Sequence, residues 1–187
     1  MGVTVDKNSR TILFHCDVNE DNIADLNQHL INFIHEDDKK ESVVVGFERE
    51  PIHLHVNSYG GTVLDMWSTV SIIRTTKTPI YTYCEGYAQS AGFILFISGD
   101  KRIVYEGAEL MYHSLSCGVF GKYQDLSERM DNIEITNNRL ERYTISRTNI
   151  SQEMLDEVRE KKQDLYIYDD KTLELGCADE VIQFIEE

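Results

Sequence analysis

Short apolar runs and longer amphipathic stretches alternate along this chain of 187 residues. Apolar runs bounded by turn residues are typical of buried strands, and apolar residues three or four positions apart are typical of one face of a helix. The pattern predicts strands at residues 11–14, 42–47, 52–56, 80–84, 102–105, 109–112 and 181–182. It predicts helices at residues 20–35, 62–74, 93–97, 124–147, 152–162 and 170–175, of which 93–97 is apolar enough to be buried. This alternation indicates an α/β fold with right-handed strand–helix–strand connections.

Residues 35–41 form a run of charged side chains and histidine. Such a run is typical of a solvated connection, and the predicted strands at 42–47 and 52–56 suggest an extra hairpin beside it. In the second of these strands, alternation with a period of two places His53 and His55 on one face. Two histidines without a third ligand nearby support a metal site only weakly, so we expect none.

A turn of small residues between the apolar runs 80–84 and 93–97 carries one hydroxyl group. Residues 86–92 read GYAQSAG, in which the hydroxyl belongs to Ser90. A strand that ends in glycine and continues as a helix places this serine at a sharp turn, with its oxygen exposed beside a helix N-terminus. The turn therefore presents a candidate nucleophile, and a simple helix cap at Ser90 is the alternative.

A serine nucleophile needs a base, and the base needs an acid that holds its tautomer. His113 is the candidate base because it ends the short apolar strand 109–112 and enters a loop that contains glycine. Asp164 is a candidate acid because it opens the aromatic segment 165–168 after a charged helix. Three other carboxylates compete for the same role, namely Asp156, Asp169 and Asp170.

Four segments, in this order, resemble the proteolytic subunit of Clp-type proteases, serine peptidases of the crotonase-like superfold. Residues 57–61 (NSYGG) resemble its oxyanion turn, residues 86–92 its nucleophile turn, and residues 111–113 (MYH) its catalytic-histidine strand. Asp164 stands at the family's distance before Gly176, which favours it over the other three acids. The resemblance spans most of residues 11–185, although Tyr59 stands where the family commonly has proline.

The resemblance implies a spiral of β-β-α units over residues 1–187, taken as one domain, with a projecting handle at about residues 114–147 that joins two seven-membered rings. It implies a triad of Ser90, His113 and Asp164, with the backbone amides of Gly61 and Ala91 as oxyanion donors. The strand beside His113 would pair with the substrate backbone, which favours broad specificity toward unfolded protein or peptide. The implied substrate-binding residues are Gly60, Thr62, Val63, Ser114, Leu115 and Ser116.

The net charge of −15 argues against nucleic acid and anionic membrane surfaces as partners. No apolar run is long enough to span a membrane, and residues 1–8 lack the pattern of a signal peptide, so we expect a cytoplasmic protein. The four cysteines are scattered, which is typical of reduced thiols, and the chemistry requires no cofactor or metal.

The sequence has no Gly-rich phosphate loop, so ATP-driven unfolding would need a separate AAA+ ATPase. About ten residues (1–10) stand where the family usually carries a longer segment that forms axial gating loops, which leaves docking of such an ATPase open.

Three alternatives remain. The first is an inactive structural ring subunit, the second a viral-type maturation or signal-peptide peptidase, and the third a crotonase-like acyl-CoA enzyme. The presence of Ser90, His113 and Asp164 in order argues against the first and third, and the absence of a lysine near Ser90 argues against the signal-peptide relatives.

Overall fold

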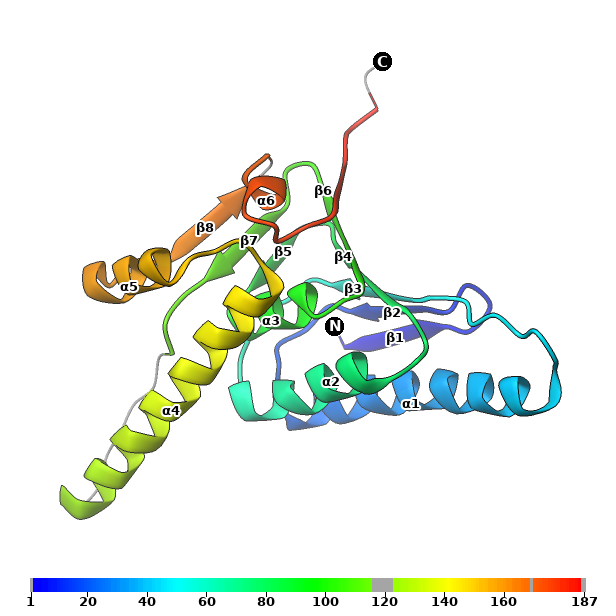
Figure 1. Cartoon of the computed structure of the whole chain (residues 1–187), viewed down its shortest axis with the longest axis horizontal. Helices are drawn as coiled ribbons and strands as arrows, with labels where there is room; N and C mark the ends of the chain where they lie inside the picture. The colour runs from blue at the N-terminus through cyan, green and yellow to red at the C-terminus, as the bar shows by residue number, and fades with distance from the viewer. Residues whose placement is uncertain (1, 116–122, 169, 186–187) are drawn as a thin grey trace.

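The computed structural model describes residues 2–115, 123–168 and 170–185. Two sheets organise these residues (Figure 1). The larger has the order β1-β2-β3-β4-β6-β9, and the smaller has the order β5-β7-β8. The strands of the larger sheet are β1 (Val3–Asp6), β2 (Thr11–Phe14), β3 (Ile52–Val56), β4 (Ile80–Cys84), β6 (Lys101–Tyr105) and β9 (Glu180–Ile182). Those of the smaller sheet are β5 (Tyr87–Gln89), β7 (Glu109–Tyr112) and β8 (Leu165–Tyr168).

Most neighbouring strands are parallel, as the alternation of strands and helices predicted. Only the β1–β2 and β7–β8 pairs are antiparallel among the strand pairs of the described residues. In β3 and β4 every second side chain is buried, and the half-buried face of β3 carries His53 and His55 as expected. His53 Nδ1 lies 2.8 Å from the Tyr83 hydroxyl and His55 contacts Glu85, while no cluster of three metal-ligating side chains occurs in the described ranges.

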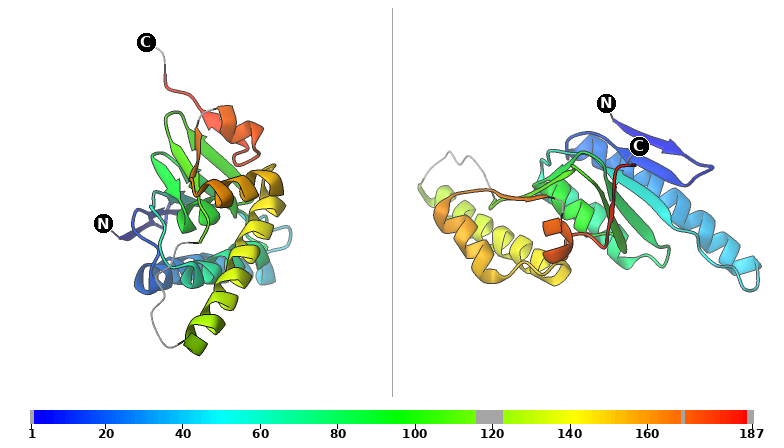
Figure 2. Two further views of the ribbon diagram at one scale, coloured as in Figure 1. Left: turned by 90° about the vertical axis from the view of Figure 1, so that its left-hand side faces the viewer. Right: turned by 90° about the horizontal axis from the view of Figure 1, so that it is seen from above.

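The described residues form six helices beside the strands, and Figure 2 shows α4 and α5 together at one end of the molecule and α1 at the other. The helix α1 packs beside α2, and α3 lies between α2 and the strands β3 and β4. The helix α4 projects away from the sheets (Figure 1). The helices are α1 (Glu20–Val43), α2 (Val63–Thr75), α3 (Ala91–Ile97), α4 (Tyr123–Arg147), α5 (Gln152–Lys161) and α6 (Asp170–Glu174). None of the described helices is both long and apolar enough to cross a membrane.

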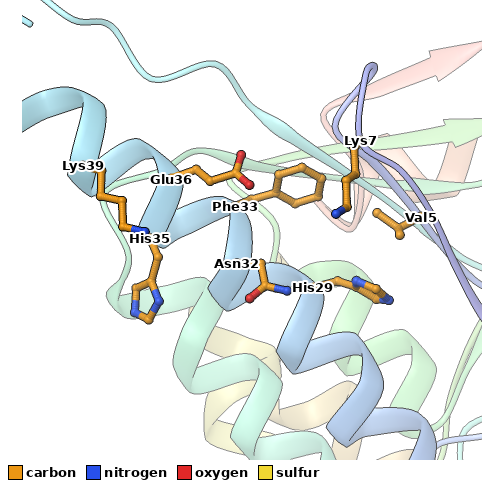
Figure 3. A pocket seen from close by; sticks show the side chains of 8 residues that line it. All are labelled: Val5, Lys7, His29, Asn32, Phe33, His35, Glu36 and Lys39. Atoms are coloured by element: carbon orange, nitrogen blue, oxygen red, sulfur yellow. The ribbon is translucent and has the colours of Figure 1, made fainter.

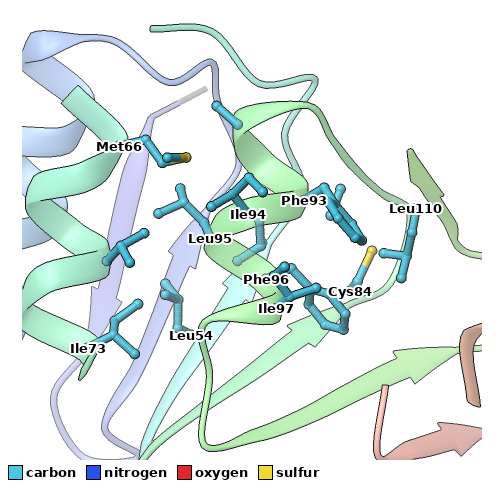
Figure 4. Packing of buried hydrophobic residues seen from close by; sticks show 14 of the residues in the cluster. Leu54, Met66, Ile73, Cys84, Phe93, Ile94, Leu95, Phe96, Ile97 and Leu110 are labelled. Carbon is cyan, nitrogen blue, oxygen red and sulfur yellow. The ribbon is translucent and has the colours of Figure 1, made fainter. Parts of the chain in front are cut away.

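The short helix α3 is the centre of the apolar cluster. All seven of its residues are buried, which confirms the prediction for 93–97. Figure 4 shows its side chains between Leu54 and Ile73 on one side and Cys84 and Leu110 on the other. Apolar burial is the main favourable term in folding, so this packing stabilises the position of α3 and of its first residue, Ala91.

The charged run 35–41 is not a solvated connection, contrary to the prediction. It forms the last turns of α1, and Asp37 within it is only 1% exposed. The carboxylate of Asp37 accepts hydrogen bonds from both terminal nitrogens of Arg10, at 3.1 and 2.7 Å, and from the Thr78 hydroxyl at 2.9 Å. A buried carboxylate with these partners explains why the helix continues through a sequence that looks fully polar.

The predicted strand and extra hairpin at 42–47 are also wrong. Ser42 and Val43 end α1, and the chain turns at Gly46, where φ is +77°. Val43 and Val45 are 78% and 104% exposed, so none of the described strands or helices covers this apolar run. By contrast, the segment 1–10, for which no strand was predicted, contributes the strand β1. The short alternation at residues 3–6 was the overlooked signal.

Candidate active site

Ser90 lies in a strained turn between β5 and α3. Its backbone has φ +53° and ψ −121°, a conformation that costs a non-glycine residue roughly 1–3 kcal/mol. The surrounding structure holds it there, because the Ser90 amide donates to the Met111 carbonyl at 2.9 Å and its carbonyl accepts from the Ile94 amide at 3.2 Å. The Ser90 side chain makes no capping hydrogen bond to α3. Its oxygen is therefore presented outward, as in a nucleophile turn.

His113 lies beside this hydroxyl because the two strands that precede them are parallel and adjacent. Gln89 at the end of β5 pairs with Met111 in β7, so the chain leaves both strands at the same edge of the small sheet. There His113 Nε2 lies 2.8 Å from Ser90 Oγ. For Ser90 to donate its proton, Nε2 must accept it, which places the proton of a neutral imidazole on Nδ1.

Asp164 lies near His113 but is not bonded to it. Antiparallel pairing joins Tyr112 of β7 to Leu165 of β8, so the residues that flank this pair, His113 and Asp164, meet at one end of the ladder. Both line one cavity of about 750 Å³. The Asp164 side chain is exposed, and no hydrogen bond joins it to His113 within the described part of the chain.

The competing acids lie in other surroundings. Asp156 Oδ1 accepts from Gln152 Nε2 at 3.1 Å and contacts Arg159 on its own helix. Asp170 begins α6. Asp169 lies outside the described residues.

Two glycines lie at the turn that faces Ser90. Gly60 and Gly61 have φ values of +98° and +143°, in the region that disfavours other residues. A Cβ atom at Gly60 would lie 2.7 Å from Ser90 Cβ and 2.9 Å from the Ala91 nitrogen, so only glycine permits this approach. Ala91 is the first residue of α3, where amides have no acceptor within the helix. The Gly61 amide likewise has no backbone acceptor among the described residues, so both are free to donate to a ligand.

Polar side chains that were not predicted join these two turns and fix the first of them. Asn57 Oδ1 accepts from the Tyr87 amide at 2.9 Å, and Ser58 Oγ accepts from the Gly60 amide at 3.1 Å. Tyr59 stacks on Tyr87 with ring centroids 4.0 Å apart. Asn and Ser in turns commonly bond to nearby backbone, and that tendency was the available signal.

The sequence-predicted binding residues surround Ser90 in part. Val63 and Leu115 line a narrow apolar cavity of about 20 Å³ beside Ser90, together with Ile94, Tyr112 and Leu140, which were not predicted. The N-cap of α2 is Thr62. Ser114 Oγ is buried without a hydrogen-bond partner in the described ranges. Ser116 lies outside the described residues, as does part of the predicted handle, residues 116–122.

A separate pocket lies between β1 and α1, away from Ser90 (Figure 3). Lys7, His29, His35 and Lys39 give it basic character, and Glu36 is the one carboxylate among its lining residues. None of the residues that line it carries a hydroxyl or a thiol nucleophile. The Ser90 site is therefore the better candidate for covalent chemistry.

A protein-family model described as Clp protease matches residues 7–184. The chain therefore belongs to the Clp protease family. It is 28% identical over 141 residues to an ATP-dependent Clp protease proteolytic subunit 1 of Streptomyces avermitilis, covering 74% of this chain and 64% of that protein. It is 31% identical over 137 residues to a proteolytic subunit 3 of Streptomyces coelicolor, covering 72% and 62%.

The chain thus spans less than two thirds of the length of these curated relatives. Among solved structures, a mutant of ClpP1 from Listeria monocytogenes superposes with a TM-score of 0.77 at 18% identity, covering 95% of this chain and 93% of that one. This likeness confirms the predicted Clp-protease fold.

Proposed function

We propose that this chain is a serine endopeptidase of the Clp proteolytic-subunit type, in which Ser90 is the nucleophile and His113 the base. The observation that carries the proposal is the 2.8 Å contact between His113 Nε2 and Ser90 Oγ at a strained strand-to-helix turn. A base within hydrogen-bond reach of a hydroxyl is the first geometric requirement for its activation.

In this mechanism Ser90 Oγ attacks the peptide carbonyl while His113 Nε2 takes its proton. The amides of Gly61 and Ala91 donate to the oxyanion that forms. His113 then gives the proton to the leaving amine, and water, deprotonated by His113, hydrolyses the Ser90 ester. Asp164 would hold the proton of His113 on Nδ1 and stabilise its charged form, which requires the Asp164 carboxylate to turn toward His113. Catalytic contacts in enzymes without substrate are often longer than in the working complex.

The lining of the cavity beside Ser90 supports a preference for apolar over charged side chains next to the cleaved bond. Val63, Ile94 and Leu140 line this cavity, and their side chains contain no polar atom. A charged side chain would lose its hydration there without gaining a partner. The remaining binding residues of the proposal are Gly60, Thr62, Ser114, Leu115 and Ser116.

We also propose that the chain forms a homo-oligomeric chamber in the cytoplasm, of two stacked rings joined through α4, and that folded substrates reach it through a separate AAA+ ATPase. Met130 and Ile135 on the projecting α4 are 56% and 63% exposed, which supports contact of this helix with a second copy. The names of the Streptomyces relatives describe ATP-dependent proteases, and this comes to the present chain as part of the proposal.

The test is hydrolysis of fluorogenic peptides with alanine, leucine or aspartate before the reporter group, together with the mass of the particle in solution. We expect an oligomer that cleaves the alanine and leucine peptides and loses turnover in Ser90→Ala but not in Ser146→Ala, a change at an exposed serine of α4. An oligomer that cleaves none of them contradicts the proposal and favours the structural-subunit alternative.

A further inference from the structure

A buried asparagine on α4 holds the segment that follows His113. Asn137 is 9% exposed, and its Oδ1 accepts a hydrogen bond from the Leu115 amide at 3.0 Å. Leu115 lines the cavity beside Ser90, as do Leu140 of α4 and His113 itself. One wall of the candidate peptidase site is therefore tied to α4 through the side chain of Asn137.

The orientation of the Asn137 amide is fixed by its other partner. Asn137 Nδ2 donates to Glu141 Oε1 at 2.7 Å, one helical turn further along α4. A carboxylate only accepts and the Leu115 amide only donates, so Oδ1 must face Leu115 and Nδ2 must face Glu141. Glu141 is 3% exposed, and its Oε2 accepts from Gln152 Nε2 at 3.0 Å.

Among the described residues, α5 and β7 bring further charged and titratable groups to this pair. Arg159 of α5 places Nη1 3.5 Å from Glu141 Oε1 and also contacts Asp156. Tyr112 of β7 is buried, and this burial, reinforced by the charge of Glu141, raises the pKa of its hydroxyl. Glu141 thus has cationic and amide partners in a buried setting, which satisfies its charge.

We propose that Asn137 is a positioning residue of the peptidase site, which sets the Leu115 wall of the cavity beside Ser90, and that Glu141 fixes its orientation. This inference rests on the proposed function. Asn137 does not contact the reacting atoms and acts through Leu115. Its loss should therefore raise KM and weaken the selection of apolar side chains more than it lowers kcat.

A conservative change makes the role visible as a pH dependence. In Asn137→Asp, two carboxyl groups face each other at hydrogen-bond distance and can be satisfied only while they share one proton, so the apparent pKa of the pair is raised. The contact with Leu115 is then present below that pKa and lost as pH rises through it. Relative to the native chain at the same pH, kcat/KM for the leucine peptide should fall roughly tenfold between about pH 5.5 and about pH 8.5.

Two variants serve as matched controls. Asn138→Asp adds the same charge at the neighbouring exposed position of α4, and we expect its activity to follow the native chain at every pH. The double variant Asn137→Asp/Glu141→Gln restores a donor opposite the new carboxylate and keeps the net charge of the native chain. It should recover native KM and selectivity even if Asn137→Asp alone folds poorly.

Hydrogen exchange of the backbone amides of residues 113–115 reports on the contact between Asn137 and Leu115 and does not require peptide cleavage. We expect faster exchange there in Asn137→Asp at high pH and native protection in the double variant. If the ratio of kcat/KM between Asn137→Asp and the native chain is the same at every pH, the positioning role is wrong while the proposed function stands. A double variant that recovers neither KM nor selectivity has the same meaning. A native chain that cleaves no peptide overturns the proposed function and this role with it.

Discussion

The hydroxyl of Ser90 and the imidazole of His113 lie 2.8 Å apart although the residues are 23 positions apart in the chain. Parallel pairing of β5 with β7 brings them together, because both residues follow directly on the ends of neighbouring strands. Functional side chains often gather where parallel strands end, since the loops there can vary without disturbing the sheet. The site therefore depends on a three-stranded sheet and on the buried helix α3 beneath it.

Gly60 should be required for activity because of its neighbours as well as its backbone angle. Replacement by alanine places Cβ 2.7 Å from Ser90 Cβ, so one of the two turns must move. We expect Gly60→Ala to lose most peptide cleavage, and to lower the free energy of unfolding by more than the roughly 1–2 kcal/mol that a left-handed alanine costs. Peptidase assays and urea unfolding measure the two effects.

Gly46→Ala is the matched control for that prediction. Gly46 also has a positive φ, of +77°, but a Cβ there would meet nothing within 4 Å. In Gly46→Ala the free energy of unfolding should fall only by the cost of the left-handed backbone, and peptide cleavage should stay at the native level. Equal loss of activity in both variants would contradict the role assigned to the contact between Gly60 and Ser90.

Asp37 should contribute strongly to stability although it belongs to a run of charges. Asp37→Ala leaves the guanidinium of Arg10, a residue that is only 9% exposed, without its carboxylate partner. Breaking a buried ion pair in this way costs roughly 3–5 kcal/mol, so the urea midpoint should fall sharply. Glu157→Gln, which removes the exposed partner of Lys161, should change the unfolding free energy by less than about 1 kcal/mol. Similar small changes in both variants would show that Asp37 is not buried in solution.

Asp164 should act on catalysis rather than on folding. Asp164→Asn keeps the shape of this exposed side chain. If Asp164 orients His113, the change lowers kcat by up to roughly ten-thousand-fold, because asparagine holds the His113 imidazole in the wrong tautomer. The unfolding midpoint should stay near that of the native chain. Asp170→Asn, at the start of α6, should keep kcat within a factor of two or so. The reverse result would assign the orienting role to Asp170.

The sequence predicted most elements around Ser90 because their signals are local. The apolar run 93–97 and the turn 86–92 carry their own patterns, and Ser151, a residue type that favours helix starts, caps α5 by accepting from the Met154 amide. The family resemblance then supplied the order of the site residues. The relation between Asp164 and His113 could not be read in this way, because a side-chain rotamer depends on its surroundings in space.

The sequence-based predictions were wrong where the burial or secondary structure of a residue depends on a partner far away in the chain. The burial of Asp37 depends on Arg10 and Thr78, which are 27 and 41 positions away, so charge composition alone pointed to solvent. Likewise, the valines at 43–45 have high strand propensity but pair with none of the described strands. The tie between Asn137 and Leu115 depends on how α4 packs, and no sequence pattern marks it.

The most direct test of the central claim is labelling with a fluorophosphonate, followed by intact mass and peptide mapping, on the native chain, Ser90→Ala and His113→Ala. The account predicts one adduct on the native chain, located at Ser90, none on Ser90→Ala, and labelling of His113→Ala slowed by at least roughly a hundredfold because the base is absent. A native chain that stays unlabelled, or a label that persists in Ser90→Ala, would contradict the assignment of Ser90 as the activated nucleophile.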